Sequence, residues 1–445
     1  MKKLSKFENL MLFLLPIVVF FSYYPLIKLG ENDSMFFELS LPIIWLAIFG
    51  TVSLVRMPKI AKNFGLAKSL VICAFPTYAT LAILWSGNKL RGVLTAGILW
   101  LIIFSVVNIL EMKLTKEYLK RLLKVYLISA AVACGVCLLQ CILDVFGAPR
   151  EATLLCEGCT YSIFGFPHPN GFAIEPQFMG NLLIAPALIA LGLFYNAIKT
   201  KKDKRTMFGF GALSFLYIMV LYITFSRGAL YAFGVAGVLF GIILLIRDKK
   251  ATAFWMLVPA VLGFVFGLLA QGVFAEISPT SENFAQGIQR SIHQVSLGKI
   301  DIREKVDGDG NESSFSGYVE ESTDIRVGWT ETAIKAWKDT NIWFGVGLGN
   351  AGTAMSKYTS GSKREIIQNE YINILTELGI VGVIILIATV IYILETSKKL
   401  GFVIIYPIVA AYLITLCFFS GFPNVLHLYL LTPVVYHLGH KRLLC

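Results

Sequence analysis

The chain has 445 residues, of which 56% are hydrophobic and only 15% are charged, and its mean hydropathy is +0.71. A soluble protein of this length carries far more charge, so the composition excludes a soluble globular fold. The formal net charge of +11 does not indicate nucleic-acid binding, because the basic residues follow the pattern of membrane loops.

Apolar runs along the chain are long enough to cross a bilayer core of roughly 30 Å as helices. The runs lie near residues 10–29, 38–55, 68–86, 91–110, 122–144, 177–198, 207–225, 229–246, 252–272, 374–395, 400–420 and 423–438. A backbone in lipid must satisfy its own hydrogen bonds, which continuous apolar runs do as helices. We therefore expect an all-α membrane protein with about twelve transmembrane helices.

Basic residues set the expected orientation. If the N-terminus is cytoplasmic, the connections on the inner side carry most of the 39 Lys and Arg residues, as the positive-inside rule requires. The short outward loops hold only Lys28, Lys89, Arg91, Arg150 and Arg227. Both termini are therefore predicted to be cytoplasmic, and Arg227 is predicted to face outward at the end of the seventh helix.

The predicted topology divides the chain into three parts. Residues 1–272 form helices one to nine with an outer loop at 146–176, residues 273–371 form a large outer loop, and residues 372–445 form the last helices. Within the large loop, two helical patterns flank a polar tract. The first has Phe284, Ile288, Ile292 and Val295 on one face, which is typical of a helix at a membrane surface. The second has Ile325, Trp329, Ala333 and Trp337 in register.

The sequence motifs that could bind a metal ion or a nucleotide are incomplete. The tract "DGDGNE" lacks the sixth-position glycine and twelfth-position glutamate of a calcium loop. Cys156 and Cys159 form a CxxC pair, for which a disulfide is plausible in an oxidising compartment and zinc is disfavoured. The glycine-rich "NIWFGVGLGNAG" lacks the Gly-Lys-Ser/Thr of a phosphate loop. It predicts a tight turn that lets the backbone approach a ligand or another helix.

Two polar clusters lie at predicted helix mouths. His168, Asn170 and Glu175 occur in "FPHPNGFAIEPQF", a loop stiffened by prolines. Gln368 and Asn369 precede the tenth helix, and Glu377 follows two turns inside it. Polar groups in such places mark a substrate path or serve as caps and interhelical contacts, and the sequence leaves both interpretations open.

Three motifs occur in order: "SRGAL" after a helix, "IRVGWTETAIKAW" with "FGVGLGNAG" downstream, and "QNEYINILTELGIVG". Together with the topology they resemble the O-antigen ligase and polymerase family of bacterial membrane glycosyltransferases, from about Phe164 to Val390. The resemblance implies a GT-C-like fold and transfer of a glycan from undecaprenyl diphosphate at the outer face of the cytoplasmic membrane. It implies no cofactor and no metal.

The resemblance also implies a site. Arginines bind and stabilise the departing lipid diphosphate, and Arg227 and Arg326 are the candidates, with lipid-headgroup snorkelling as the alternative for Arg227. Gln368, Asn369, Asn170 and Arg364 are candidates for substrate binding. The implied partners are the lipid-linked glycan, a glycan or lipid acceptor, membrane lipids and, for a polymerase, a chain-length regulator.

One position departs from the ligase pattern. Ligases of this family have a histidine where this chain has Gln368, followed by a glycine that Gly379 matches in spacing. Glutamine cannot take a proton, so a ligase-type general base is missing there, and Glu175 or His168 is left to supply it. This departure and the "GFAIEPQF" motif favour a polymerase. The competing hypotheses are a transporter or lipid-linked glycan flippase, against which the absence of repeated halves argues, and a scaffolding membrane protein.

Overall fold

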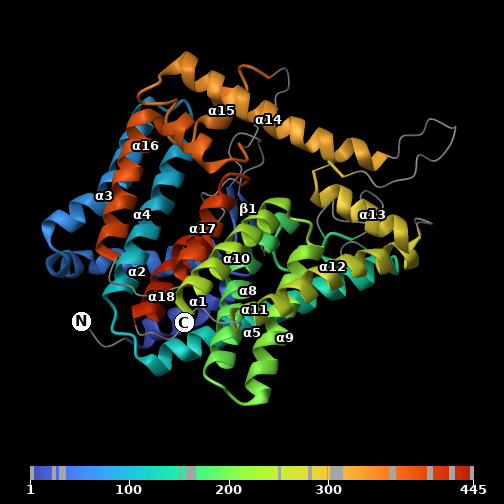
Figure 1. Cartoon of the computed structure of the whole chain (residues 1–445). Helices are drawn as coiled ribbons and strands as arrows, with labels where there is room; N and C mark the ends of the chain where they lie inside the picture. The colour runs from blue at the N-terminus through green and yellow to red at the C-terminus, as the bar shows by residue number, and fades with distance from the viewer. Residues whose placement is uncertain are drawn as a thin grey trace. The chain divides into compact units, whose positions relative to one another are not determined.

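The computed structural model (Figure 1) describes the backbone of most of the chain. The described residues are 5–22, 27–29, 37–149, 153–155, 167–248, 252–278, 283–297, 299–300, 314–359, 367–397, 404–419 and 426–440. The predicted features at Cys156, Cys159, the "DGDGNE" tract and Arg364 lie outside these ranges.

The chain forms two compact units, each built from segments that are distant in sequence. Unit 1 comprises residues 1–122, 325–401 and 416–443, and unit 2 comprises residues 123–324, 402–415 and 444–445. The three-part division by topology stays a prediction. The helices of unit 1 are α1 (Lys6–Val18), α2 (Leu41–Phe64), α3 (Leu66–Leu81), η1 (Ala82–Trp85), α4 (Lys89–Glu111), α15 (Ala351–Met355), α16 (Glu370–Ser397) and α18 (Leu426–His440).

The regular elements among the described residues of unit 2 are all helices. Its helices are α8 (Pro176–Lys199), α9 (Lys204–Ile223), α10 (Arg227–Asp248), α11 (Thr252–Trp255), α12 (Leu257–Ile277), α13 (Phe284–Val295) and α17 (Ile405–Thr415). The unit boundaries fall within α5 (Lys116–Val145) and α14 (Ser314–Thr340).

The helices confirm the membrane-type all-helical fold. Every predicted apolar run contains a helix, and eight described helices are long and apolar enough to span a bilayer, with shorter apolar helices at 69–85 and 405–415. The count of about twelve stays a prediction. The first run, 10–29, is wrong as a single helix: α1 ends at Val18, and Ile27–Leu29 forms strand β1, paired antiparallel with β2 (Phe37–Leu39). After Val18 the chain turns, because the N–H groups of Phe20 and Phe21 bond three residues back, to Ile17 O and Val18 O, and not four.

In unit 1, α16 is broken at Gly379, where φ is +63°. The break removes helical hydrogen bonds, and the glycine-rich segment 341–349 replaces them. The bonds are Ile380 N–H to Ile342 O (3.1 Å), Val381 N–H to Trp343 O (3.1 Å), Val346 N–H to Thr376 O (2.9 Å) and Gly347 N–H to Glu377 O (2.9 Å). The glycine-rich segment therefore approaches another helix, one of the two roles predicted for it.

Glu377 fixes the far end of the same segment. Its carboxylate accepts hydrogen bonds from the backbone N–H groups of Gly349 (2.9 Å) and Ala351 (3.2 Å). Its side chain is 9% exposed, and a buried carboxylate is stable only where such donors satisfy it. Glu377 thus has a structural role at this position, consistent with the polar-contact interpretation of its motif.

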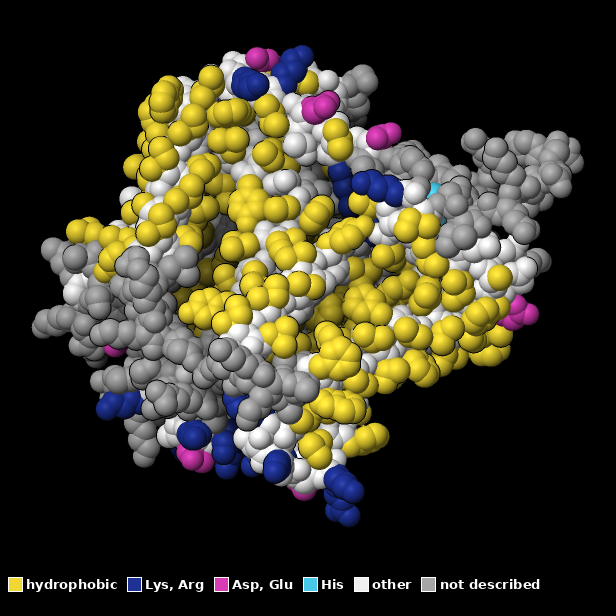
Figure 2. Space-filling view, in the orientation of Figure 1, with side chains coloured by type: hydrophobic (Ala, Val, Ile, Leu, Met, Phe, Trp, Pro, Cys, Tyr) yellow, Lys and Arg dark blue, Asp and Glu magenta, His cyan; other side chains and the backbone are white. Residues whose placement is uncertain are grey.

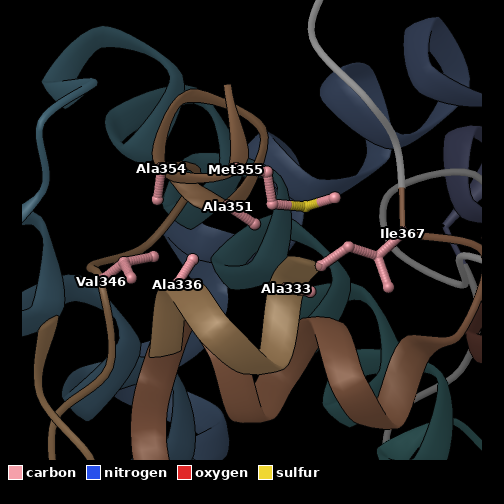
Figure 3. Packing of buried hydrophobic residues seen from close by; sticks show 7 residues of the cluster. All are labelled: Ala333, Ala336, Val346, Ala351, Ala354, Met355 and Ile367. Atoms are coloured by element: carbon pink, nitrogen blue, oxygen red, sulfur yellow. The ribbon is translucent and has the colours of Figure 1, made fainter. Parts of the chain in front are cut away.

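A small apolar cluster holds α14 and α15 onto this region (Figure 3). Ala333 and Ala336 of α14 pack with Val346, Ala351, Ala354, Met355 and Ile367, and Trp329 lies against the cluster. The predicted face of the second loop helix is confirmed at Trp329 and Ala333, whereas Ile325 is 43% exposed. The alanines permit close approach, so the chain just before α16 is held against α14.

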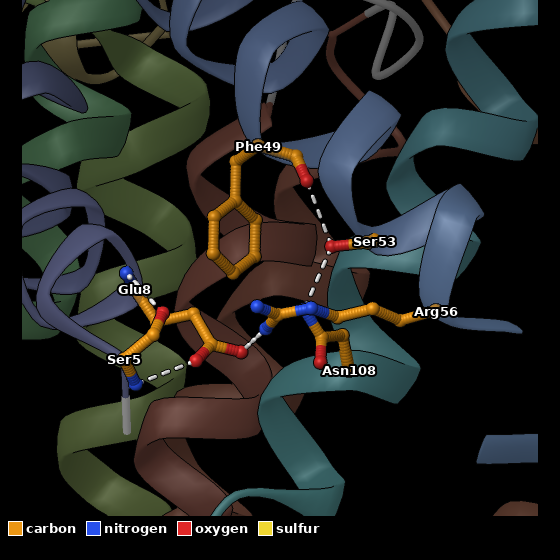
Figure 4. A network of polar contacts seen from close by, with 6 residues as sticks. All are labelled: Ser5, Glu8, Phe49, Ser53, Arg56 and Asn108. Atoms are coloured by element: carbon orange, nitrogen blue, oxygen red, sulfur yellow. Dashed lines mark hydrogen bonds and ion pairs between the residues drawn. The ribbon is translucent and has the colours of Figure 1, made fainter. Parts of the chain in front are cut away.

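A polar network joins α1, α2 and α4 (Figure 4). Glu8 completes a capping box with Ser5 at the start of α1 and forms an ion pair with Arg56 of α2. Nearby, the Ser53 hydroxyl accepts a hydrogen bond from the Asn108 amide (2.9 Å) and donates one to the Phe49 carbonyl oxygen (2.8 Å). The buried side chains of Glu8, Ser53 and Asn108 thus all have hydrogen-bonding or ion-pair partners, as buried polar groups in folded proteins generally do.

In unit 2, α8 is the most enclosed helix, and 89% of its apolar window is buried. It packs against α9, α10 and α17. By contrast, α12 leaves a row of apolar side chains exposed, as the hydrophobic surface in Figure 2 shows. The row consists of Leu257, Val258, Val261, Leu262, Val265, Phe266, Leu269, Val273 and Ile277. An apolar surface of this kind is stable against lipid tails and not against water.

The replacement Gly379→Ala tests the repaired break in α16. We expect it to destabilise the protein by more than ~2 kcal/mol, because the left-handed backbone alone costs a non-glycine residue about 1–2 kcal/mol. In addition, the new Cβ would lie 2.3 Å from the Trp343 carbonyl oxygen. Thermal unfolding of the detergent-solubilised protein measures the effect.

Gly97→Ala in α4 is the matched control, because a Cβ at Gly97 meets nothing within 4 Å and alanine has the higher helix propensity. Its melting temperature should equal or slightly exceed that of the wild type. A Gly379→Ala protein that melts with the wild type would contradict the role given to the break.

Candidate functional site

The loop before α8 is held by a side-chain amide of α5. Gln140, itself 3% exposed, accepts a hydrogen bond from the Gly171 N–H (2.8 Å) and donates one to the Gly171 carbonyl oxygen (3.1 Å). Asn170 donates from its side-chain amide to the Ala173 carbonyl oxygen. Together with the prolines, these bonds hold His168, Asn170 and Glu175 in one defined loop.

The turn between α9 and α10 has a strained residue. Phe225 has φ of +49°, which is unfavourable for a bulky side chain. Its backbone N–H bonds to the Tyr222 carbonyl oxygen (3.0 Å). The turn makes Arg227 the first residue of α10, where it is half-buried. Strain of this kind, about 1–3 kcal/mol, is typical of functional sites.

His168 connects the loop to the turn. Its ring lies on the ring of Phe225, with 5.1 Å between the ring centroids. The turn is also joined to the start of α8, because the Ser226 hydroxyl donates to the Gln177 carbonyl oxygen (3.4 Å). The predicted residues His168, Asn170, Glu175 and Arg227 are therefore brought together at one end of unit 2.

The charge state of His168 follows from its surroundings. Burial, and then the positive charges of Arg227 and Arg290, lower the pKa of His168 to about 3. The imidazole is therefore neutral at physiological pH and a weak proton acceptor.

Glu175 occupies the N-cap position of α8 without capping it: its side chain makes no hydrogen bond to the first turn. The residue is exposed. Pro176 at the next position begins the helix, where the ring suits the first turn. The carboxylate is thus accessible to solvent at the start of α8, two residues before Gln177, whose carbonyl oxygen accepts the hydrogen bond from Ser226.

Arg290 of α13 joins this group although the sequence did not single it out. Its helix is joined to the turn that carries Arg227, because the next residue, Ser291, bonds through its hydroxyl to the Tyr222 hydroxyl (2.8 Å). The helix itself was predicted, and its apolar residues were assigned to a membrane surface. In the structure the deeply buried side chains of α13 are polar, namely Ser291, His293 and Gln294, beside Gly287. Arg290 lies next to these polar residues in the sequence of α13, and this was the signal in the sequence that could have identified it.

The other predicted residues belong to unit 1. Arg326 lies on α14, half-buried, one turn before Trp329. Asn369 accepts a hydrogen bond from the Ile372 N–H (3.1 Å), so it caps the start of α16. The side-chain oxygen of Gln368 has no hydrogen-bond partner among the described residues. The structure thus describes the candidate residues as two groups, one in each unit.

Among the described residues, no three His, Cys, Asp or Glu side chains lie close enough to hold a metal ion. Cys134, Cys137 and Cys141 of α5 are fully buried free thiols. This confirms the packing role predicted for them.

Residues 212–387 match the family model described as O-antigen ligase, which confirms the family resemblance predicted from the motifs. The match covers less than half of the chain. It includes Arg227, Arg290, Arg326, Gln368 and Asn369, and so extends over residues of both groups. The transporter alternative gains no support from it. No curated protein and no solved structure matches the chain.

The neutrality of His168 predicts a pH effect on stability. The folded pKa of about 3 lies below the unfolded value near 6.5, so between these values the unfolded state binds more protons. Stability is therefore lost as pH falls below about 6.5. Between pH 6.5 and pH 4.5 the loss from this residue is at most roughly 3 kcal/mol.

Thermal unfolding at pH 7 and at pH 4.5 measures this loss. His168→Gln cannot titrate, so its melting temperature should fall less than that of the wild type over the same interval. Parallel falls in the two proteins would mean that His168 is not buried as a neutral group.

Proposed function

We propose that this chain, whose residues 212–387 match the O-antigen ligase family model, transfers a glycan from undecaprenyl diphosphate to a glycan acceptor. The reaction takes place at the outer face of the bacterial cytoplasmic membrane. The observation that carries the proposal is the family match, because one continuous match includes the SRGAL turn, Arg326 and the start of α16. We further propose that the chain is a polymerase rather than a ligase, and that it needs no metal ion.

The proposed reaction is a substitution at the anomeric carbon. A hydroxyl oxygen of the acceptor attacks this carbon, and the bond from the carbon to the phosphate oxygen breaks. The electron pair leaves with the lipid diphosphate, and the hydroxyl proton passes to the Glu175 carboxylate. Negative charge grows on the diphosphate as the bond breaks, so guanidinium groups placed there stabilise the transition state more than the ground state.

Arg227 is suited to the diphosphate for two reasons. Its planar guanidinium can donate two parallel hydrogen bonds to one phosphoryl group. It also begins α10, a helix of 22 residues, and the start of a helix favours anions. Arg326, on α14, is proposed as the second diphosphate ligand, with Gln368, Asn170 and Arg364 binding the glycan.

The polymerase assignment rests on the entrance to α16. Gln368 replaces the histidine of the ligase pattern, and neither Gln368 nor the helix-capping Asn369 can accept a proton at neutral pH. A base on the α8 side, Glu175, removes the need for that histidine. The glycan profile of a deletion strain separates the activities: single repeats still attached to the acceptor indicate a lost polymerase, and free carrier-linked polymer indicates a lost ligase.

The outward orientation of this site is also proposed. α9 has 20 residues, about 30 Å at 1.5 Å per residue, enough to cross the hydrocarbon core. The lysines around Thr200 lie at one end of α9 and Arg227 follows the other end. The positive-inside rule then places the lysines in the cytoplasm and Arg227 outside. About twelve helices, with both termini cytoplasmic and a long outer loop at 273–371, complete the proposed topology.

Labelling with a membrane-impermeant thiol reagent tests the orientation. In a cysteine-free background, Glu175→Cys should react in intact cells, whereas Lys201→Cys should react only after the membrane is opened. Both positions are exposed in the structure. The reverse pattern would place the proposed chemistry in the cytoplasm and contradict the proposal.

Replacement of the arginines tests the reaction. Arg227→Ala and Arg326→Ala should each remove long glycan chains from a complemented deletion strain, because loss of one group that stabilises transition-state charge typically lowers the rate about 10²–10³-fold. Glu175→Gln should have a comparable effect. Electrophoresis of the extracted polysaccharide gives the readout, and immunoblotting gives the protein level.

Arg205→Ala is the matched control, because Arg205 is an exposed arginine at the opposite end of α9. It should leave chain length unchanged. Normal chain lengths in both Arg227→Ala and Arg326→Ala would exclude these residues from the site.

A further inference from the structure

Helix α13 is fixed in place by its small and polar face. It begins with a capping box formed by Asn283 and Gln286. At Gly287 it approaches α12 so closely that a Cβ would lie 2.5 Å from the Cβ of Ala275. Any larger side chain would force the two helices apart. The backbone of α13 therefore has one defined position relative to α12.

Two hydrogen bonds then connect α13 to both sides of Arg227. The Tyr222 hydroxyl, before the turn, bonds to the Ser291 hydroxyl (2.8 Å). The Tyr231 hydroxyl, one turn into α10, donates to the Val295 carbonyl oxygen (2.6 Å). Arg290 directly precedes Ser291, so this pair of bonds holds Arg290 close to the turn that carries Arg227.

The ring of His168 lies between these elements and the loop before α8. Tyr222 contacts Phe225, with 5.8 Å between the ring centroids, and Phe225 contacts His168. Arg227 and Arg290 both lower the pKa of His168. The two arginines therefore lie on elements that hydrogen bonds and ring contacts join to the His168 ring.

A second observation points to a ligand beside Arg290. His293, one turn further along α13, is 3% exposed, and neither of its ring nitrogens has a hydrogen-bond partner among the described residues. Gln294 is 4% exposed, and its side-chain oxygen also has no hydrogen-bond partner among the described residues. A buried polar group without a partner costs about 1–3 kcal/mol, so such groups call for a ligand or an ordered water.

We propose that Arg290 is a further substrate-binding residue, which contacts the diphosphate of the lipid carrier together with Arg227. This proposal rests on the proposed function of the site. A diphosphate has two phosphoryl groups, and each can accept a bidentate contact from one guanidinium. Arg227 and Arg290 would thus each contact a phosphoryl group of the same anion, in addition to the contact proposed for Arg326, and α13 would be part of the active site rather than a surface helix.

Arg290 has one main alternative role. An arginine near a membrane surface also binds the phosphate of an ordinary lipid headgroup. The two sources share a phosphate but differ in charge and in the number of phosphoryl groups. A binding experiment that offers both can separate them.

The experiment uses the full-length protein in nanodiscs of phosphatidylcholine, with undecaprenyl diphosphate without a glycan as the probe. Binding is measured for the wild type, Arg290→Ala, Arg290→Gln, Arg290→Lys, Arg227→Ala and Lys299→Ala. Lys299 is an exposed cation shortly after α13 and provides the matched control. Thermal unfolding of each variant identifies a protein that fails to fold, and Arg290→Gln keeps much of the arginine's packing.

We expect Arg290→Ala and Arg290→Gln to weaken binding about tenfold or more, because each loses a charge-assisted contact worth about 1.5–3 kcal/mol. Arg290→Lys should retain part of the affinity, because lysine keeps the charge but not the planar fork. Lys299→Ala should bind like the wild type. Inorganic pyrophosphate should compete with the probe, and phosphatidylglycerol in the nanodisc should not.

Several results would overturn the proposal. If Arg290→Gln folds and binds like the wild type while Arg227→Ala loses binding, Arg290 is not a ligand and the proposed function survives. If Arg227→Ala also binds like the wild type, the diphosphate site itself is misplaced. If phosphatidylglycerol competes as well as pyrophosphate does, Arg290 is a headgroup contact.

Discussion

The structure depends on one constraint: backbone hydrogen-bonding groups inside an apolar helical bundle must find partners within the protein. The break in α16 at Gly379 shows how the constraint is met in unit 1, because the segment 341–349 supplies the carbonyl and N–H groups that the broken helix lacks. Glu377 then secures that segment through its carboxylate. Most of the bonds around the break are thus made with a segment that itself needed partners, and the Tyr78 hydroxyl of α3 donates to the Leu378 carbonyl oxygen (2.9 Å).

Unit 2 meets the same constraint with side chains. Gln140 satisfies both backbone groups of Gly171, and the tyrosines before and after the α9–α10 turn bond to α13. Each of these bonds also holds an irregular segment that carries a candidate active-site residue. Catalysis by electrostatic stabilisation requires charges that are already in place before the reaction. The rigidity that the bundle imposes on its loops therefore serves the chemistry proposed for them.

The sequence predicted the helices well because the length of an apolar run reflects the thickness of a bilayer. It failed between residues 19 and 29, where apolar aromatic residues satisfy the same hydropathy criterion but the chain leaves the helix at Val18. It also placed His168, Asn170, Glu175 and Arg227 in one predicted site with Arg326, Arg364, Gln368 and Asn369. The structure adds contacts around the first four, such as the stacking of His168 on Phe225, whereas Arg326, Gln368 and Asn369 belong to unit 1.

What the sequence determined by itself is the class of the protein, its apolar segments and the family to which residues 212–387 are similar, because these depend on local composition and motif order. Only the tertiary structure decided which polar groups meet. Tyr222 and Ser291 are 69 residues apart, and no local pattern indicates that they bond. The burial that makes His168 neutral, and the position of Arg290 near Arg227, likewise arise from packing between helices, which a linear pattern does not encode.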